Sequence, residues 1–324
     1  MGSPCTERRP GLWLYWLAMV RRTQTVYVAT DPFFSPRGKV LYGFDHFLEE
    51  TARASMPCVW ITSCTRAQLD EPRRRFGQSD PYIGENGCGV YLPEDYFHLK
   101  ASSTIRLGRY TCIPVAKPQP AAAEGLVELS SDLGTSVVPL RSLSQRELSQ
   151  NTGLPPREAD LVRQRDFDEL FFFAGASESE VQEFREEAKR RQMVLLPAGA
   201  FWSISCGANL AKCVRELGGL YDRALRAHAL RVGVRLAPPD MEARTEAAWP
   251  RAAFDKTLTI EERLTRKQAL THANDAASAA VDNTEEEAKA TERRDRNRFY
   301  LYAPDVWSEL RYAIEGSAHG KPPF

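Results

Sequence analysis

The sequence predicts an α/β protein in which a doubly wound parallel sheet carries an inserted α/β domain. Two short apolar, β-branched runs, 25–29 and 57–62, alternate with segments whose apolar residues recur at helical spacing. Alternating strands and helices are typical of a doubly wound sheet. The pattern changes over residues 94–197, which hold strands and helices of their own. We therefore expect a core made of residues 23–93 and 198–324, interrupted by a second α/β domain.

Composition narrows the class of protein. The 324 residues suffice for about two domains, and 43% of them are hydrophobic against 27% charged. This balance excludes global disorder and a membrane bundle. Because 43 basic residues match 43 acidic ones, no net positive field exists to bind nucleic acid. Seven cysteines without a C-x-x-C pair fit neither a disulfide framework nor a zinc site, which predicts a cytoplasmic protein.

The two ends of the chain differ from its middle. Residues 1–22 form an expected leader, whose apolar run is about half as long as the ~20 residues of a membrane-spanning helix. The leader has the outline of a secretory signal without a cleavage site, and its start matches a myristoylation pattern. The alternative is that the true start is Met19 rather than Met1. Near the other end, a charged insertion is expected at about 256–298, before an amphipathic helix with Val306, Trp307, Leu310 and Ile314 on one face.

Polar residues stand directly after the first two expected strands. The first strand leads into Thr30, Asp31 and Pro32, and the second ends at Ser63. Ligands of doubly wound sheets bind beyond the carboxyl ends of the strands. Asp31 and Ser63 are therefore expected where the chemistry takes place. Residues 81–92 then predict a hairpin with a Gly-rich turn.

The inserted domain and the return to the core are expected as a series of short elements. In chain order these are a Pro/Ala/Gln loop at 117–124, a helix at 142–151, a polar segment at 157–169, a strand at 170–174 and a helix at 178–192. The return to the parent sheet is expected at 201–205, followed by a helix at 210–229 and a strand at 232–234.

Several blocks, in this order and spacing, resemble those of the haloacid-dehalogenase-like phosphatases, and more closely those of the mannosyl-3-phosphoglycerate phosphatases. The blocks are Asp31, Ser63, the turn 85–87, and the segments 152–155, 163–169 and 207–221. The resemblance covers about residues 25–242, with a weaker match at 304–314. It implies a Rossmann-like core with an α/β cap, here 94–197, that closes over a sugar phosphate.

The resemblance also implies a catalytic scheme. In active relatives an aspartate attacks phosphorus, an acid two residues on protonates the leaving oxygen, and a lysine helps to neutralise the phosphate. Asp31 stands at the nucleophile position, and Ser63 stands where a hydroxyl donates to a phosphate oxygen. Phe33 stands at the acid position. Leu210 stands at the lysine position, with Lys212 about 200° away around a helix.

The metal motif is also altered. In the family, the nucleophile, a backbone carbonyl and a later aspartate hold magnesium. Leu236 falls where that aspartate is expected, so Asp31 and Asp240 are the carboxylates that remain. Magnesium prefers hard oxygen ligands in near-octahedral geometry, so the predicted site is weak and magnesium is expected only if the protein is active. Arg235 offers a fixed positive charge in the metal's place, as a further hypothesis.

Two segments carry side chains that suit a phosphoglycerate and a sugar. Guanidinium groups bind carboxylate and phosphate, whereas carboxylates bind sugar hydroxyls. The residues concerned are Arg163, Arg165, Asp168 and Glu169 in the cap, and Glu85 and Asn86 on the hairpin. On spacing alone, the cap segment fits a solvated charged turn, and the hairpin residues fit ordinary turn polarity. The resemblance favours ligand contact for the cap residues, and for Glu85 and Asn86 both interpretations stay open.

These observations favour a catalytically impaired relative of the family. We expect it to bind a phosphorylated sugar, a sugar-glycerate or a protein partner in the cleft between core and cap. The alternative is an active phosphatase that forms an aspartyl-phosphate on Asp31 with a rearranged acid and metal site. The charged segment 271–298 is a further candidate for contact with a protein.

Overall fold

We describe a computed structural model of the chain. It describes residues 24–35, 39–98, 101, 103–198, 200–237, 249–261, 298–301 and 306–318. The expected leader, Asp240 and most of the charged insertion lie outside the described residues.

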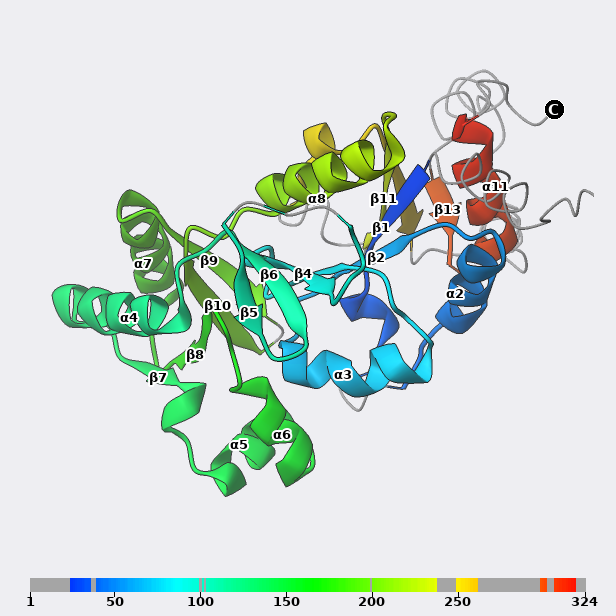
Figure 1. Cartoon of the computed structure of the whole chain (residues 1–324). Helices are drawn as coiled ribbons and strands as arrows, with labels where there is room; N and C mark the ends of the chain where they lie inside the picture. The colour runs from blue at the N-terminus through cyan, green and yellow to red at the C-terminus, as the bar shows by residue number, and fades with distance from the viewer. Residues whose placement is uncertain are drawn as a thin grey trace, which may run out of the picture.

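The larger of two sheets has nine strands among the described residues, in the order β13-β12-β11-β1-β2-β3-β4-β6-β5 (Figure 1). Neighbours from β13 to β3 are parallel, and β4, β6 and β5 continue the sheet as antiparallel strands. The strands are β1 (Gln24–Ala29), β2 (Cys58–Ile61), β3 (Tyr82–Gly84), β4 (Gly89–Pro93), β5 (Ile105–Leu107), β6 (Tyr110–Pro114), β11 (Leu230–Ala237), β12 (Lys256–Glu261) and β13 (Arg298–Tyr300).

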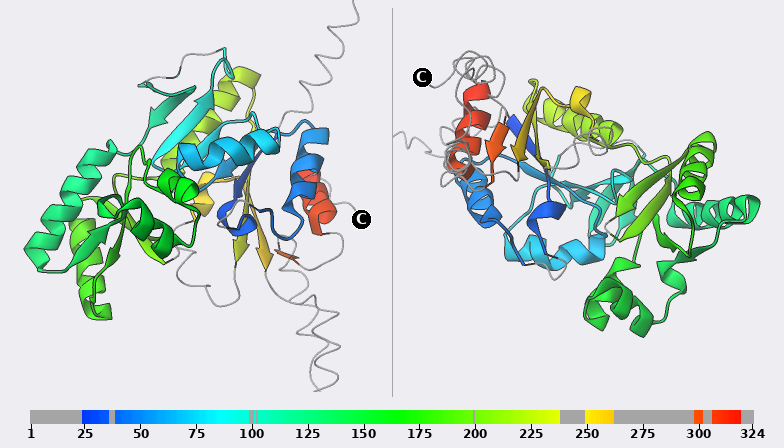
Figure 2. Two further views of the ribbon diagram at one scale, coloured as in Figure 1. Left: turned by 90° about the horizontal axis from the view of Figure 1, so that it is seen from below. Right: turned by 180° about the vertical axis from the view of Figure 1, so that it is seen from behind.

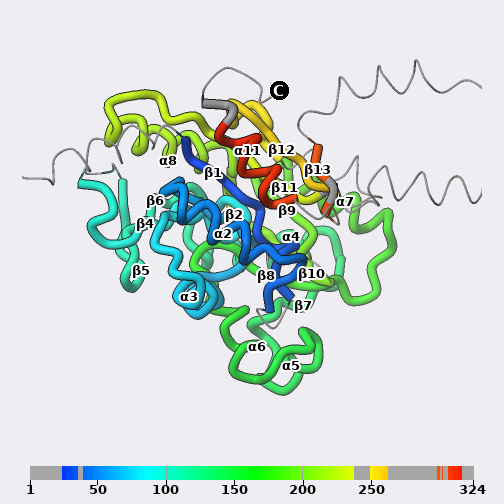
Figure 3. Tube along the Cα trace, turned by 90° about the vertical axis from the view of Figure 1, so that its right-hand side faces the viewer, coloured from blue at the N-terminus to red at the C-terminus, as the bar shows by residue number. Residues whose placement is uncertain are grey.

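Helices cover both faces of this sheet. One face packs against α2 (Phe44–Arg53), α3 (Arg66–Arg75) and α11 (Val306–Ala318), and Figure 3 shows α2 and α11 side by side over β1. The other face packs against α8 (Leu210–Leu225) and the short helix η3 (Arg251–Ala253). Both faces of the central strands are buried, which explains why β1 and β2 are short apolar runs.

The smaller sheet is antiparallel, in the order β7-β8-β10-β9. One face packs against α4 and α7, and the other against α5 and α6, as the reverse view in Figure 2 shows. Its elements are α4 (Gln119–Leu133), β7 (Val137–Pro139), η2 (Leu140–Ser142), α5 (Gln145–Thr152), α6 (Pro156–Val162), β8 (Glu169–Phe173), α7 (Glu178–Arg190), β9 (Met193–Ala198) and β10 (Phe201–Cys206). The predicted α/β class, with a parallel sheet core and a second α/β unit, is confirmed.

Several local predictions are wrong. Residues 117–124 are not a loop, because α4 begins at Gln119. Proline is tolerated in the first turn of a helix, since the backbone N–H that it lacks would have no partner within the helix there. Residues 201–205 do not return to the parent sheet: as part of β10 they pair with β8 and β9. The polar segment 157–169 carries no predicted helix or strand, and its first part lies in the helix α6, which is an addition to the prediction and does not contradict it.

The predicted start of the charged insertion, at about residue 256, is also wrong. Residues 256–261 form β12, which lies between β11 and β13 in the larger sheet and buries Leu258 and Ile260. The domain limits 94–197 stay a prediction. Sheet membership favours later limits, since β5 and β6 extend the larger sheet and β10 belongs to the smaller one. Within the described residues, no helix combines the length and apolar character needed to cross a membrane.

Candidate functional site

Asp31 is exposed just beyond the carboxyl end of β1, at the start of the short helix η1 (Asp31–Phe33). Its carboxylate accepts hydrogen bonds from the Thr62 hydroxyl and, at 2.8 Å, from the Ser63 backbone N–H. The backbone N–H of Thr30 donates to the carbonyl of Ile61 at 2.9 Å, which fastens the ends of β1 and β2 together. Asp31 and Ser63, predicted from separate strands, therefore lie side by side.

Thr62 is the residue that sequence reasoning missed here. It follows β2 directly, and its buried hydroxyl touches Asp31 while accepting from the backbone N–H of Cys64 at 3.0 Å. The available signal was its position: a hydroxyl at the carboxyl end of an apolar strand, next to the predicted Ser63. Thr62 holds one carboxylate oxygen of Asp31 in place, and the backbone of the half-buried Ser63 holds the other.

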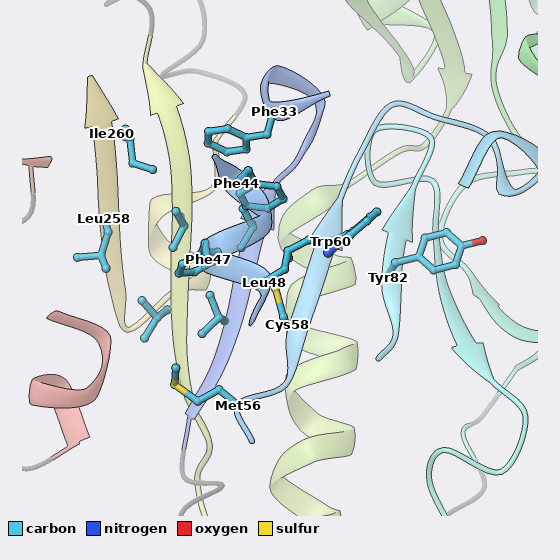
Figure 4. Packing of buried hydrophobic residues seen from close by; sticks show 14 of the residues in the cluster. Phe33, Phe44, Phe47, Leu48, Met56, Cys58, Trp60, Tyr82, Leu258 and Ile260 are labelled. Atoms are coloured by element: carbon cyan, nitrogen blue, oxygen red, sulfur yellow. The ribbon is translucent and has the colours of Figure 1, made fainter. Parts of the chain in front are cut away.

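The position expected to supply a proton is buried in hydrocarbon. Phe33 is fully buried, and its ring stacks on Phe44 with centroids 4.5 Å apart. Trp307 of α11 meets the Phe33 ring edge to face, with the two ring centroids 5.7 Å apart. Figure 4 shows Phe33 and Phe44 packed together near Ile260. Phe33 is thus a core residue, and it cannot donate a proton.

Leu210, at the position of the phosphate-binding lysine, is the first residue of α8 and packs against the hydrophobic cluster below that helix. The preceding Asn209 caps the helix by accepting the Lys212 N–H at 2.9 Å. Gly87 of the hairpin approaches so closely that a Cβ there would lie 2.8 Å from the Leu210 Cα. Lys212 is exposed. A hydrocarbon side chain therefore stands where the scheme needs a cation.

The metal position is apolar as well. Leu236 of β11 packs against the same hydrophobic cluster as Phe33. Magnesium is the group that the fold family implies. Among the described residues, no group of three or more His, Cys, Asp and Glu side chains could hold a metal ion, and Asp31 is the one predicted carboxylate ligand that they include. Asp240, the other predicted ligand, lies outside the described residues.

Arg235 is buried beside these residues and makes a long contact, 3.5 Å, from its Nε to the Thr259 hydroxyl. Burial lowers the pKa of its guanidinium, and the positive charges of Arg251 and Arg298 lower it further. The hypothesis that Arg235 replaces a metal's charge stays a prediction, because nothing here places its guanidinium beside Asp31.

Glu85 contacts the smaller sheet from the hairpin of the larger one. The residue is buried with a left-handed φ of 48°. Its carboxylate accepts the backbone N–H groups of Asp166 and Phe167, each at 2.8 Å, and of Asp168 at 3.1 Å. All three donors belong to the turn before β8. Glu85 is therefore used inside the protein, as an anchor for that turn.

Arg165 and Asp168 form a buried ion pair next to Glu85. Their side chains are 3% and 0% exposed, and both Nε and Nη2 of Arg165 donate to the Asp168 carboxylate. Nη2 also donates to the Ser63 carbonyl at 2.6 Å, and the Ser203 hydroxyl donates to Asp168 at 2.5 Å. We call Glu85, Arg165 and Asp168 the clamp, because together they join the smaller sheet to the loop that holds Asp31.

The clamp carries two carboxyl groups and one guanidinium. Burial and, to a smaller extent, the negative charge of Asp168 raise the pKa of Glu85 to about 8, against the lowering effect of Arg165. One guanidinium balances the charge of only one of the two carboxylates, so the other carboxyl group is favoured in its protonated form. Because its pKa is raised, Glu85 is the group that is protonated near neutral pH.

The other predicted substrate residues also have partners within the protein. Arg163 donates to the Asp160 carboxylate and to the Leu143 carbonyl. Glu169 is buried against Arg141, at 2.8 Å, and Gln119, and burial raises its pKa.

Asn86 is the exception among them. Its backbone N–H donates to the Thr62 carbonyl at 3.1 Å, whereas its side-chain Nδ2 is buried without a hydrogen-bond partner among the described residues. Of the six predicted substrate residues, Asn86 is therefore the one with a buried donor to offer a ligand.

Comparison with known proteins agrees with the predicted family. A glucosyl-3-phosphoglycerate/mannosyl-3-phosphoglycerate phosphatase of Methanococcoides burtonii is 25% identical over 166 residues, 51% of this chain and 61% of the relative. The mannosyl-3-phosphoglycerate phosphatase of Pyrococcus furiosus is 22% identical over 186 residues, 57% of this chain and 74% of the relative. This chain resembles the mannosyl-3-phosphoglycerate phosphatases.

The match to mannosyl-3-phosphoglycerate phosphatases is partial, since it spans 61% of the length of the Methanococcoides protein. No family model matches the chain. Among solved structures, one from Thermoplasma acidophilum has a TM-score of 0.48 at 12% identity, covering 73% of this chain and 92% of its own. A haloacid dehalogenase-like hydrolase from B. subtilis has a TM-score of 0.44 at 13% identity, covering 73% and 94%.

Proposed function

We propose that this protein is a mannosyl-3-phosphoglycerate phosphatase-like protein in which hydrolysis is impaired, and that it binds a phosphorylated sugar or sugar-glycerate between its two sheets. The observation that carries the proposal is the burial of Phe33, at the position of the general acid, in a fully apolar cluster. A leaving alkoxide would find no proton donor at that position.

The expected loss of rate is large. General acid catalysis is worth about 10²–10⁴-fold, and one preorganised electrostatic contact about 10²–10³-fold. The replacements at Phe33 and Leu210 together correspond to roughly 10⁴–10⁷-fold, as a guide, because groups that act together are not additive.

Charge at Asp31 supports the same conclusion. A phosphate placed about 4 Å from a carboxylate meets a repulsion of about 4 kcal/mol per pair of unit charges at an effective dielectric constant of ~20. The family scheme offsets this repulsion with a lysine and a metal. Here Leu210 and Leu236 stand at those positions, so the attack of Asp31 on phosphorus is disfavoured before any bond forms.

Ligand binding, in contrast to hydrolysis, is supported by the side-chain amide of Asn86. Its buried, unpaired amide lies on the turn that is hydrogen-bonded to Thr62, next to Asp31. An unpaired buried donor is costly, so a ligand oxygen that accepts from Nδ2 is favoured. Contact with a protein partner in this region stays a prediction.

The second candidate is an active sugar-phosphate phosphatase with a rearranged acid and metal site. The observation in its favour is Asp31 itself, which is exposed and oriented by Thr62 and Ser63 at a strand end. Phosphomonoester hydrolysis through an aspartyl-phosphate would require an acid and a cation from residues other than Phe33, Leu210 and Leu236.

Turnover and binding assays on the full chain distinguish these two functions. Mannosyl-3-phosphoglycerate, glucosyl-3-phosphoglycerate and p-nitrophenyl phosphate are incubated with the protein and with Asp31→Asn, each with and without magnesium. We expect no rate above the Asp31→Asn control, and saturable binding of mannosyl-3-phosphoglycerate that Asn86→Ala weakens. An Asp31-dependent rate would establish the active phosphatase instead.

A matched control checks the role of Asn86. Asn151, an exposed residue of α5, donates to the Glu147 carbonyl at 2.8 Å, so Asn151→Ala also removes an amide but lies in another part of the fold. Equal weakening of binding by Asn86→Ala and Asn151→Ala would argue against ligand contact at Asn86.

A further inference from the structure

A cavity lies away from Asp31, where the C-terminal end of α3 meets β4 and β6. Its volume is about 360 Å³, within the range of small-molecule sites, and its lining includes Arg73, Arg74, Arg109, Gln78 and Glu94. None of its lining residues belongs to the clamp or touches Asp31. The proposed function makes no use of this cavity.

Arg73 is the unusual residue in its wall. It is 2% exposed, and its Nη2 donates to the Asp80 carbonyl, while its Nε and Nη1 have no hydrogen-bond partner among the described residues. The guanidinium lies over the Tyr82 ring, 4.7 Å from the centroid. Stacking stabilises the charge but leaves two buried donors unpaired, and a buried unpaired donor of this kind is costly.

A neighbouring ring holds a second guanidinium in the same wall. Arg109 lies over Tyr110 at 5.2 Å, and the rings of Tyr110 and Tyr82 meet edge to face at 5.3 Å. Arg109 is paired with Asp70 in an exposed ion pair, 58% and 50% accessible, which is a weak competitor for an incoming anion.

The remaining polar groups define what fits the cavity. Arg74 is exposed and makes no ion pair among the described residues, and the one acid in the lining, Glu94, is paired with Arg106. Gln78 contributes a buried Oε1 that accepts no hydrogen bond from any described residue. Three arginines against one paired acid favour an anion, and the orphaned acceptor favours a hydroxyl on the same molecule.

We propose that this cavity is a second binding site, for a small phosphorylated polyol. The phosphate lies among Arg73, Arg74 and Arg109, whose planar groups match its oxygens, and a hydroxyl donates to Gln78 Oε1. The volume exceeds the space that one phosphate ion fills, which is why an organic phosphate is favoured over the bare ion.

Calorimetric titration of the full chain tests the site with glycerol 1-phosphate as the probe, and with inorganic phosphate and glycerol for comparison. Glycerol 1-phosphate should bind saturably and more tightly than either. Arg74→Ala and Arg109→Ala should each weaken this binding about 5–10-fold, because each removes one charge-assisted contact. Gln78→Leu should weaken glycerol 1-phosphate but leave inorganic phosphate unchanged.

Arg75→Ala is the matched control. Arg75 follows Arg74 in α3, is exposed, and is not among the residues that line the cavity. Asp31→Asn separates this site from the other one, since binding in the cavity should not change in that variant. Absence of saturable binding, equal weakening by Arg75→Ala, or loss of binding in Asp31→Asn alone would overturn the proposal while leaving the proposed function to its own assay.

Discussion

Removal of the one cation in the clamp should destabilise the protein strongly. Arg165→Met keeps an unbranched side chain of similar length but leaves the Asp168 carboxylate buried without a counter-charge, next to the protonated Glu85. The Arg165 and Asp168 side chains are 3% and 0% exposed, so water cannot replace the lost contact. Breaking one partner out of a buried pair costs about 3–5 kcal/mol of unfolding free energy.

An exposed pair in the same protein sets the scale. Arg106 and Glu94 lie 3.0 Å apart, with both side chains 58% accessible. Such pairs contribute about 0–1 kcal/mol, so Arg106→Met should change the free energy of unfolding by no more than that. The double variant Arg165→Met/Asp168→Leu should recover part of the loss, because it removes the uncompensated carboxylate as well.

Equilibrium urea denaturation of the wild type, the two single variants and the double variant measures these differences. The reasoning fails if Arg165→Met costs no more than Arg106→Met, or if the double variant is less stable than Arg165→Met. Either result would mean that the three clamp residues do not share a water-free contact in the folded protein.

Three further outcomes are expected. Folding raises the Glu85 pKa from 4.5 to about 8. The contribution of Glu85 to the free energy of unfolding is therefore greatest below pH 4.5 and is lost as the pH rises to about 8. Urea titrations at several pH values should show the wild type losing stability over this range relative to Glu85→Gln. Phe33→Ala should cost about 3–5 kcal/mol of unfolding free energy in the same assay, and a much smaller cost would mean that the ring cluster is loosely packed. Asn209→Ala removes the cap of α8 and should cost about 1 kcal/mol, with Asn151→Ala, a likewise exposed residue that caps no helix N-terminus, as the comparison.

The strand ends were predictable because local patterns determine them. An apolar run followed by Asp31 or Ser63 identifies both the strand and its carboxyl end, and parallel pairing of β1 with β2 then brings the two residues together. The closing helix was equally clear, since Val306, Trp307, Leu310 and Ile314 are all buried in α11.

Sheet membership was less predictable. Residues 201–205 form an apolar strand that suits either sheet, and only the antiparallel partners β8 and β9 decide between them. For β12, the strand signal is present in the alternation of Thr257, Leu258, Thr259 and Ile260, but the charged residues that follow are typical of an insertion.

The roles of the charged residues depended on contacts that no local pattern encodes. Arg165 and Asp168 are three residues apart, a spacing that fits a solvated turn, a ligand site or an internal pair. Their burial follows from Glu85, about 80 residues earlier, which anchors the backbone of the same turn. The buried internal pair is neither the solvated turn nor the ligand contact that were predicted, because it depends on this long-range contact.

The apolar replacements at the chemical positions belong to one packing arrangement. Phe33 and Leu236 lie on different elements, η1 and β11, yet both pack into the cluster formed with α2 and α11. A carboxylate at Phe33, which is fully buried, would be surrounded by hydrocarbon, and burying an unpaired charge there is more costly than losing the ring alone, whereas Leu236 is half-buried. The two positions are thus linked through the core, and an acid restored at Phe33 would destabilise the fold while supplying the proton donor.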